Sequence, residues 1–272
     1  MTTVTGDATR LVRIAIEGGA TLVIAVGGDG TFGEAVNGFL DANGGMPESC
    51  AFAALAGGTG CDFVRSLERS SLDPVQRIAE SYVRPIDLGK ITYSSETGGQ
   101  ESRLFINAAG FGLSGEVCRA VNATPAANVL PGTLAYYIAT ISSVWRHRSS
   151  SIRLSIDNQP SFVLDQSLTV VANGQYFGGG MHIAPNARLD SGVFEIMVLK
   201  TTQKLQLIGQ LPLVYRGAHA THPNIAFFSG RRVVAETVAD EADRPPVDID
   251  GESPGYLKAV FEILPGALLL RQ

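Results

Sequence analysis

The first ninety residues alternate between two kinds of apolar pattern. TLVIAV (21–26) and AFAALA (51–56) are short, continuous apolar runs closed by glycines, which is typical of fully buried strands. Around them, apolar residues recur at helical spacing in segments that we expect to be capped by Asp7, Thr31 and Asp73. Helices that alternate with buried strands of this length predict parallel βαβ units in an α/β domain.

Beyond about residue 84 the pattern becomes strand-like, with segments separated by turn residues, which favours an antiparallel β-sandwich. These segments read IDLGKITY, ESRLFINAAGF, SIRLSI, SLTVVAN, GVFEIMVL, NIAFFSGRRVVAE, VDIDGE and KAVFEIL. Two segments at helical spacing, 133–146 and 202–216, interrupt them. We therefore predict a Rossmann-like α/β domain with a parallel sheet over residues 1–84, rejoined by 261–272, and a β-sandwich domain over 85–260.

Composition narrows the class of protein. The 272 residues are 45% hydrophobic and carry 21 Lys+Arg against 26 Asp+Glu, a net charge of −5. A chain of this length can bury a core without disulfides, and its three cysteines have no metal-binding spacing. The acidic balance, without a Lys/Arg run, argues against nucleic-acid binding. No apolar signal segment or membrane-spanning run is visible, so we expect a soluble, cytoplasmic protein.

Two glycine-rich loops follow the predicted buried strands. GGDGT (27–31) and GGTG (57–60) each stand between a strand and the start of a helix. The carboxyl ends of parallel strands are where phosphate groups bind to the N–H groups of loops and helix starts. The pattern therefore predicts a phosphate site, with tight βα turns that bind no ligand as the alternative.

The first loop is not a simple dinucleotide fingerprint. Gly28, Gly30 and Gly33 have its spacing, but the second strand ends at Ala56 without the acid that binds a ribose. No G-x-x-x-x-G-K-[ST] motif occurs in the chain. Because Asp29 would repel a bare pyrophosphate, its carboxylate fits a metal–nucleotide complex or a group that takes a proton from an attacking hydroxyl.

Five blocks, in order along nearly the whole chain, resemble the diacylglycerol kinase catalytic family, which includes bacterial soluble lipid kinases and the related sphingosine and ceramide kinases. The blocks are VGGDGTFGEAVNGF (26–39), LAGGTGCDFVRSL (55–67), FINAAGFG (105–112), VANGQYFGGGMHIAPNARLDSGVFEI (171–196) and VDIDGES…FEILPGALLL (247–270). NAD kinases share the GGDGT loop but not the later blocks. The resemblance implies an α/β domain of the kind found in NAD kinases.

The resemblance implies ATP-dependent phosphorylation of a lipid hydroxyl, first of all the conversion of diacylglycerol to phosphatidic acid in phospholipid biosynthesis. Glu252 matches the family's proton acceptor, with Asp29 and Asp250 as further catalytic carboxylates. Phosphoryl transfer depends on positioning, charge neutralisation and a carboxylate near the incoming hydroxyl. The residues that the resemblance assigns to the nucleotide are Thr2, Gly28, Asp29, Gly30, Thr31, Gly33, Glu34, Gly58, Thr59 and Asp62.

Three features depart from the family pattern. The family's Mg²⁺ loop maps onto Arg188, Ser191 and Val193, with serine in place of the usual aspartate ligand and Asp190 beside it. A hard cation prefers carboxylate oxygen, so we expect this metal site to be weakened or rearranged. Cys61 stands where the family has asparagine. The strand and the Asn-Pro turn that open the family pattern are lacking.

The implied partners are ATP with Mg²⁺ and a lipid substrate at the inner face of the membrane, where the protein would be peripherally associated; a homodimer stays open. One alternative is a catalytically impaired relative that binds lipid or nucleotide, and a further one is an NAD kinase. Asp62 could equally cap a helix, and Asp250 and Glu252 could be ordinary turn acids.

Overall fold

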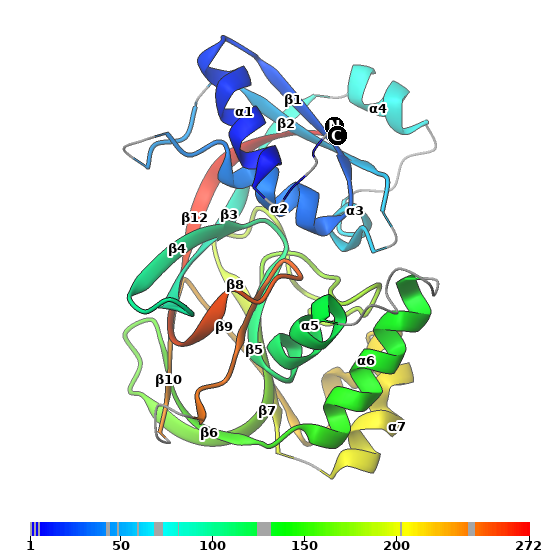
Figure 1. The fold of residues 1–272 in the computed structure, drawn as a ribbon, viewed down its shortest axis with the longest axis vertical. Coiled ribbons are helices and arrows are strands. Elements are labelled where there is room, and N and C mark those ends of the chain that lie inside the picture. Colours follow the sequence, from blue (N-terminus) through cyan, green and yellow to red (C-terminus); the bar gives the residue numbers. More distant parts are fainter. Residues whose placement is uncertain are drawn as a thin grey trace.

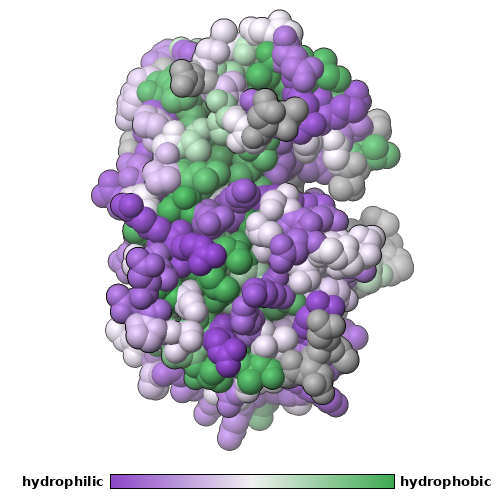
Figure 2. Space-filling view, turned by 90° about the vertical axis from the view of Figure 1, so that its left-hand side faces the viewer, coloured by the Kyte–Doolittle hydropathy of each residue, from purple (hydrophilic) through white to green (hydrophobic). Residues whose placement is uncertain are grey.

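The computed structural model consists of two parts stacked along its long axis (Figure 1). One side of the molecule is mostly hydrophilic, with separate apolar areas, and is indented where the two parts meet (Figure 2). For residues 132–138 the structure gives the course of the backbone only. The structure describes residues 2, 4, 6–41, 44–47, 49–58, 60–67, 73–80, 82–123, 132–201, 203–238 and 243–272.

The upper part in Figure 1 holds a short parallel sheet flanked by helices. Its elements are α1 (Asp7–Glu17), β1 (Leu22–Gly27), α2 (Asp29–Asn37), β2 (Ala51–Ala56), α3 (Asp62–Arg65) and α4 (Pro74–Glu80). β1 and β2 pair in parallel over their full lengths. Phe32, Val36 and Phe39 of the α2 region are at most 2% exposed and pack in the core that includes Phe52 of β2. The predicted α/β arrangement with a parallel sheet is confirmed.

The lower part is an antiparallel β-sandwich with helices on one side (Figure 1). Phe105, Phe111, Phe194 and Phe261 are completely buried in its core. The predicted β-sandwich is confirmed. Its elements are β3 (Val83–Ser95), β4 (Gln100–Phe105), β5 (Ala108–Gly112), α5 (Leu113–Ala123), α6 (Gly132–Arg146), β6 (Ser150–Ile156), β7 (Phe162–Ala172), β8 (Phe194–Lys200), α7 (Lys204–Tyr215), the 3₁₀ helix η2 (Ala218–Thr221), β9 (Ile225–Gly230), β10 (Arg232–Thr237), β11 (Val247–Ile249) and β12 (Gly255–Arg271).

Two long strands connect the parts. β3 and β12 pair antiparallel, from Val83 opposite Arg271 to Ser95 opposite Gly255, and run from the upper into the lower part (Figure 1). The last residues of β12 also pair in parallel with β2. The carboxyl-terminal end of the chain therefore belongs to the same sheet as the two strands that precede the glycine loops.

Two helices of the upper part begin differently from the prediction. α2 begins at Asp29 with Gly28 as its N-cap, and not after Thr31. α1 begins without a side-chain cap from Asp7. Instead, the carboxylate of Glu34 on α2 accepts hydrogen bonds from backbone N–H groups at the start of α1 at 2.9 and 3.3 Å. A tertiary contact thus replaces the local cap that the sequence suggested.

One helix was not expected. The predicted single strand ESRLFINAAGF (101–111) is divided into β4 and β5, and α5 follows at once. A Cβ atom on Gly115 of α5 would lie 2.3 Å from the carbonyl oxygen of Pro246, so this helix packs against a backbone that only glycine can approach. Glycine near a helix start weakens the local helical signal, which explains the omission.

The two helices predicted in the second domain are present as α6 and α7. In α6, Val144 is buried, whereas Ile141 and Trp145 are 40% and 54% exposed. The apolar residues that recur at helical spacing in 133–146 are therefore only partly buried over residues 139–146. The others, Leu134, Tyr137 and Ile138, have side chains outside the described residues.

Candidate active site

The two glycine loops lie against each other, because β1 and β2 are parallel neighbours. The N–H of Gly57 donates to the carbonyl oxygen of Gly27 at 2.8 Å. A Cβ atom on Gly58 would lie 2.8 Å from the Cα of Gly28, closer than real Cβ contacts. Glycine is therefore required at position 58, and the two loops form one continuous surface.

Two side chains fasten these loops together. The thiol of Cys61 lies 3.4 Å from the carbonyl oxygens of both Gly27 and Gly58, so it bridges the two loops. The carboxylate of Asp29 accepts the first two N–H groups of α3 at 3.0 and 2.9 Å. Both oxygens of Asp29 therefore point to the start of α3, where the partial positive charge of the N–H groups stabilises the carboxylate.

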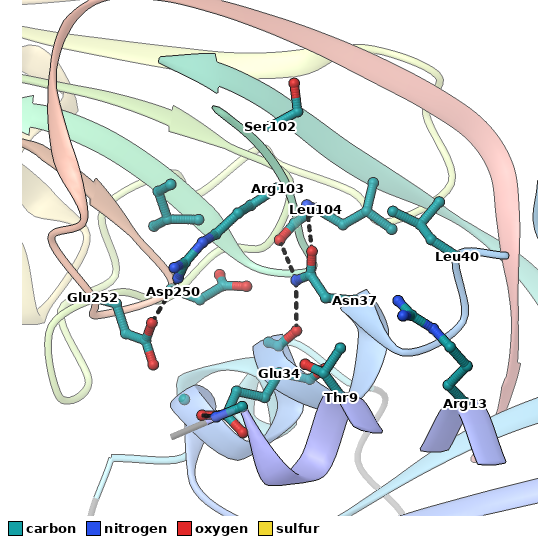
Figure 3. Close-up of a pocket in the computed structure, with 14 residues that line it drawn as sticks. Thr9, Arg13, Glu34, Asn37, Leu40, Ser102, Arg103, Leu104, Asp250 and Glu252 are labelled. Carbon is teal, nitrogen blue, oxygen red and sulfur yellow. Dashed lines mark hydrogen bonds and ion pairs between the residues drawn. The ribbon is translucent and has the colours of Figure 1, made fainter. Parts of the chain in front are cut away.

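A cavity of about 380 Å³ opens between α1, α2 and β4 (Figure 3). Gly30 and Gly33 line it from α2, and Arg103 lines it from β4. Asp250 and Glu252 reach it from the turn that follows β11. The structure thus brings part of the predicted phosphate loop and two predicted catalytic carboxylates into one cavity. Its charged lining residues are Arg13, Glu34, Arg103, Asp250 and Glu252.

Glu252 is held at the rim of this cavity by a tight turn and an ion pair. Ile249 and Glu252 exchange two backbone hydrogen bonds of 2.8 and 2.9 Å across the turn. The Oε2 atom of Glu252 lies 2.9 Å from Nη1 of Arg103. The Glu252 side chain is 34% exposed, so the ion pair orients its carboxylate without closing it off.

Asp250 is the buried partner of Glu252 in the same turn. Its carboxylate accepts hydrogen bonds from the N–H groups of Ile106, Asn107 and Ala108 at 2.8 to 3.1 Å, in the gap between β4 and β5. Burial raises the pKa of Asp250 to about 7, although these three donors oppose the shift. A Cβ atom on Gly33 would lie 3.3 Å from the same carboxylate, so Asp250 packs directly against α2.

Asn37 and Arg103 belong to the site but were not found from the sequence. The Asn37 side chain donates to the carbonyl oxygens of Gly33 and Leu104 at 2.8 and 2.9 Å, and accepts from the N–H of Leu104 at 2.9 Å (Figure 3). It thereby extends the edge of β4 and ties the phosphate-loop helix to the second part. No local pattern singles out Asn37, because two of its three hydrogen bonds go to Leu104, 67 residues along the chain.

Asp62 makes a second link between the parts, away from the cavity lining. Its Oδ2 accepts the N–H of Gly179 at 2.7 Å, and Asp62 is only 3% exposed. Burial, with the nearby Asp29 carboxylate, raises the pKa of Asp62 to about 6. This buried aspartate therefore connects α3 to the glycine-rich loop before β8.

Other predicted site residues lie elsewhere. Thr2 is exposed, Thr31 lies in the first turn of α2, and Thr59 is outside the described residues. The predicted cation loop, residues 188–193, does not line the cavity. Within the part of the chain that the structure describes, no three His, Cys, Asp or Glu side chains are grouped to hold a metal. No helix among those residues has both the length and the apolar character needed to span a membrane.

Comparison with known proteins agrees with this architecture. Residues 1–91 match the diacylglycerol kinase catalytic domain, and residues 107–271 match the YegS C-terminal NAD kinase beta sandwich-like domain. The chain is 27% identical over 263 residues to the "Diacylglycerol kinase" of Bacillus subtilis strain 168, covering 96% of this chain and 80% of the relative.

Two further relatives extend the likeness. The "Probable lipid kinase YegS-like" of Pseudomonas aeruginosa is 28% identical over 267 residues, covering 97% of this chain and 80% of its own length. The crystal structure of a diacylglycerol kinase from Bacillus anthracis has the same fold, with a TM-score of 0.74 at 24% identity, over 99% of this chain and 83% of that one. With both domain models matched in order and the second alone covering more than half of the sequence, the chain belongs to the diacylglycerol kinase/YegS-like lipid kinase family.

Proposed function

We propose that this protein transfers the γ-phosphoryl group of ATP to a lipid hydroxyl, with diacylglycerol as the acceptor and phosphatidic acid as the product. The observation that carries the proposal is the shared cavity. Gly30 in the first turn of α2, Gly33 in the middle of that helix and the carboxylate of Glu252 line the same space. A phosphate group bound at the start of α2 would therefore face a carboxylate that can accept a hydroxyl proton, as phosphoryl transfer requires.

The start of α2 is suited to the triphosphate. The first N–H groups of a helix have no partner within the helix, and they carry the positive end of the helix dipole. Asp29 would otherwise weaken this site, but its carboxylate binds the N–H groups of α3. Mg²⁺ bound to ATP would supply further charge neutralisation. We propose Asp29 as a residue that positions the two loops.

Glu252 is proposed as the proton acceptor. The lipid hydroxyl oxygen attacks the γ-phosphorus, its proton passes to the Glu252 carboxylate, and ADP leaves with the electron pair of the broken P–O bond. Arg103 orients the Glu252 carboxylate through the 2.9 Å ion pair. Asp250 fixes the turn that carries Glu252 through its three backbone hydrogen bonds.

The acceptor resides in a bilayer, and Glu252 lies at an open rim. We therefore propose that the enzyme works at the inner surface of the membrane as a peripheral, cytoplasmic protein. Its partners would be ATP and a membrane lipid.

The choice of acceptor tests this proposal. The purified chain is incubated with [γ-³²P]ATP, Mg²⁺ and either diacylglycerol in mixed micelles with anionic lipid, or NAD⁺. We expect label in the lipid product and none on NAD⁺. Label on NAD⁺ alone would identify an NAD kinase. Thermal stabilisation by ATP without any transfer would identify a nucleotide-binding relative that has lost activity, and either result would overturn the proposal.

A further inference from the structure

The loop of residues 188–193 is closed by the hydroxyl group of its own serine. Oγ of Ser191 lies 2.8 Å from the carbonyl oxygen of Val193 and 3.1 Å from that of Arg188. Arg188 and Val193 are two of the residues onto which the family's Mg²⁺ loop maps, and Ser191 stands in the place of its side-chain ligand. The Ser191 hydroxyl donates its one proton to these two carbonyl oxygens. It therefore lies where a metal ion would have to sit to be coordinated by both carbonyls.

The nearest carboxylates already have partners. Asp190 lies 3.1 Å from Nε of Arg188 and 3.5 Å from Nη1 of Arg84, so two guanidinium groups balance its charge. Asp87 is 3% exposed, and its two oxygens accept N–H groups of Gly192 and Gly266 at 2.6 and 2.8 Å. A hard divalent cation takes about six to eight oxygen ligands and favours carboxylates. Because both nearby carboxylates already have partners, this loop provides few oxygen ligands for such a cation.

The same contacts fix the loop without a metal. Asp87, on β3, also donates its own N–H to the carbonyl oxygen of Leu189 at 2.6 Å. Its carboxylate then spans from Gly192 in the loop to Gly266 in β12. Asp87 thus holds the loop at Leu189 through its backbone and at Gly192 through its side chain, and so ties the loop to the two strands that connect the parts of the molecule.

We infer that the Ser191 hydroxyl and the Asp87 carboxylate together replace a structural divalent cation in this loop, and that the loop binds no Mg²⁺ of its own. The inference concerns only the folded chain and does not depend on the proposed reaction. Its consequence is that Mg²⁺ would affect this protein only through the nucleotide.

The test uses the full chain without nucleotide, with thermal unfolding recorded in EDTA and in millimolar MgCl₂ at matched ionic strength. Wild-type protein is expected to keep the same Tm in both. Ser191→Ala should lower the Tm equally in both. Ser191→Asp restores a carboxylate ligand, so its Tm should fall in EDTA and recover by a few degrees or more in MgCl₂.

Ser161→Asp, which adds a carboxylate at an exposed position before β7, is the control and should show no such recovery. Calorimetric titration of wild-type protein with MnCl₂ should detect no stoichiometric site. The inference is overturned if wild-type protein binds one cation per chain and loses stability in EDTA. It is equally overturned if a folded Ser191→Asp variant responds to Mg²⁺ no more than Ser161→Asp. If Ser191→Asp does not fold, the wild-type titration decides.

Discussion

Arg103 on β4 and Glu252 after β11 are 149 residues apart in the sequence, yet their side chains form a 2.9 Å ion pair at the rim of the cavity beside α2. The pair is about one-third exposed on both sides, so it adds little to the stability of the fold. Its role is to position a side chain, because the guanidinium restricts the orientation of the carboxylate that we propose as the proton acceptor.

Replacing Arg103 should therefore affect turnover more than binding. In Arg103→Gln we expect kcat for lipid phosphorylation to fall by roughly 10- to 100-fold with little change in KM for ATP, because a carboxylate displaced by about 1 Å loses its alignment. Arg103→Lys should restore part of the activity. Steady-state kinetics measure both. Equal losses in Arg103→Gln and in Arg232→Gln, whose partner is Glu262 on the sandwich surface, would contradict a positioning role.

The contact between the glycine loops makes a prediction about nucleotide binding. A methyl group at position 58 would collide with the Cα of Gly28, so Gly58→Ala should push the loops apart. We expect the Kd for Mg-ATP to rise at least about tenfold, since the helix start would no longer face the phosphates. Titration calorimetry provides the measurement.

Gly209→Ala is the matched control, because nothing lies within 4 Å of a Cβ atom at that position in α7. Unchanged nucleotide affinity in a folded Gly58→Ala variant would show that the loop contact is not needed for the phosphate site.

A buried aspartate predicts how stability changes with pH. Asp248 is fully buried, and burial raises its pKa from an ordinary 3.8 to about 7, with the hydrogen bond from the N–H of Gly251 as the largest opposing effect. The folded state therefore holds the proton more tightly than the unfolded state. This contribution to stability is complete below about pH 4 and is lost as the pH rises through about 7.

Asp248→Asn removes the titration while keeping the shape of the side chain. Its free energy of unfolding should fall less between pH 5 and pH 8 than that of the wild type. Each unit of difference between the folded and unfolded pKa of Asp248 corresponds to about 1.4 kcal/mol. Urea unfolding at the two pH values tests this. Parallel decreases in both proteins would show that Asp248 does not carry the pH dependence.

The parts of the fold that could be predicted are those with a local signal. AFAALA (51–56) is a strand over its whole predicted length, and Asp73 accepts N–H groups at the start of α4 as an N-cap should. The start of α1 was misplaced because Glu34 of α2 supplies its cap across two helices. The start of α2 was misplaced because Gly28, and not Thr31, is its N-cap. α5 was not predicted because Gly115 weakens its local helical pattern. Glycine is required there by close packing against Pro246.

The residues of the candidate site also differ in whether the sequence could predict them. Motif spacing identified Gly30 and Gly33, and the family resemblance identified Glu252. The structure places all three on one cavity, and their roles are proposals. Arg103 and Asn37 could not be found, because their importance comes from partners far along the chain. A polar residue gains such a role only when strand pairing brings its partner near, and no local spacing encodes that pairing.

The central claim is that Glu252 accepts the proton of a lipid hydroxyl beside the phosphate loop. The direct measurement is the rate of ³²P transfer from ATP to diacylglycerol by wild type, Glu252→Gln and Glu262→Gln, the last removing a comparable carboxylate from a surface ion pair. The account predicts that Glu252→Gln loses about 10²- to 10⁴-fold in kcat, with its Tm and ATP affinity retained, while Glu262→Gln stays close to wild type. Transfer by Glu252→Gln at the wild-type rate would contradict it.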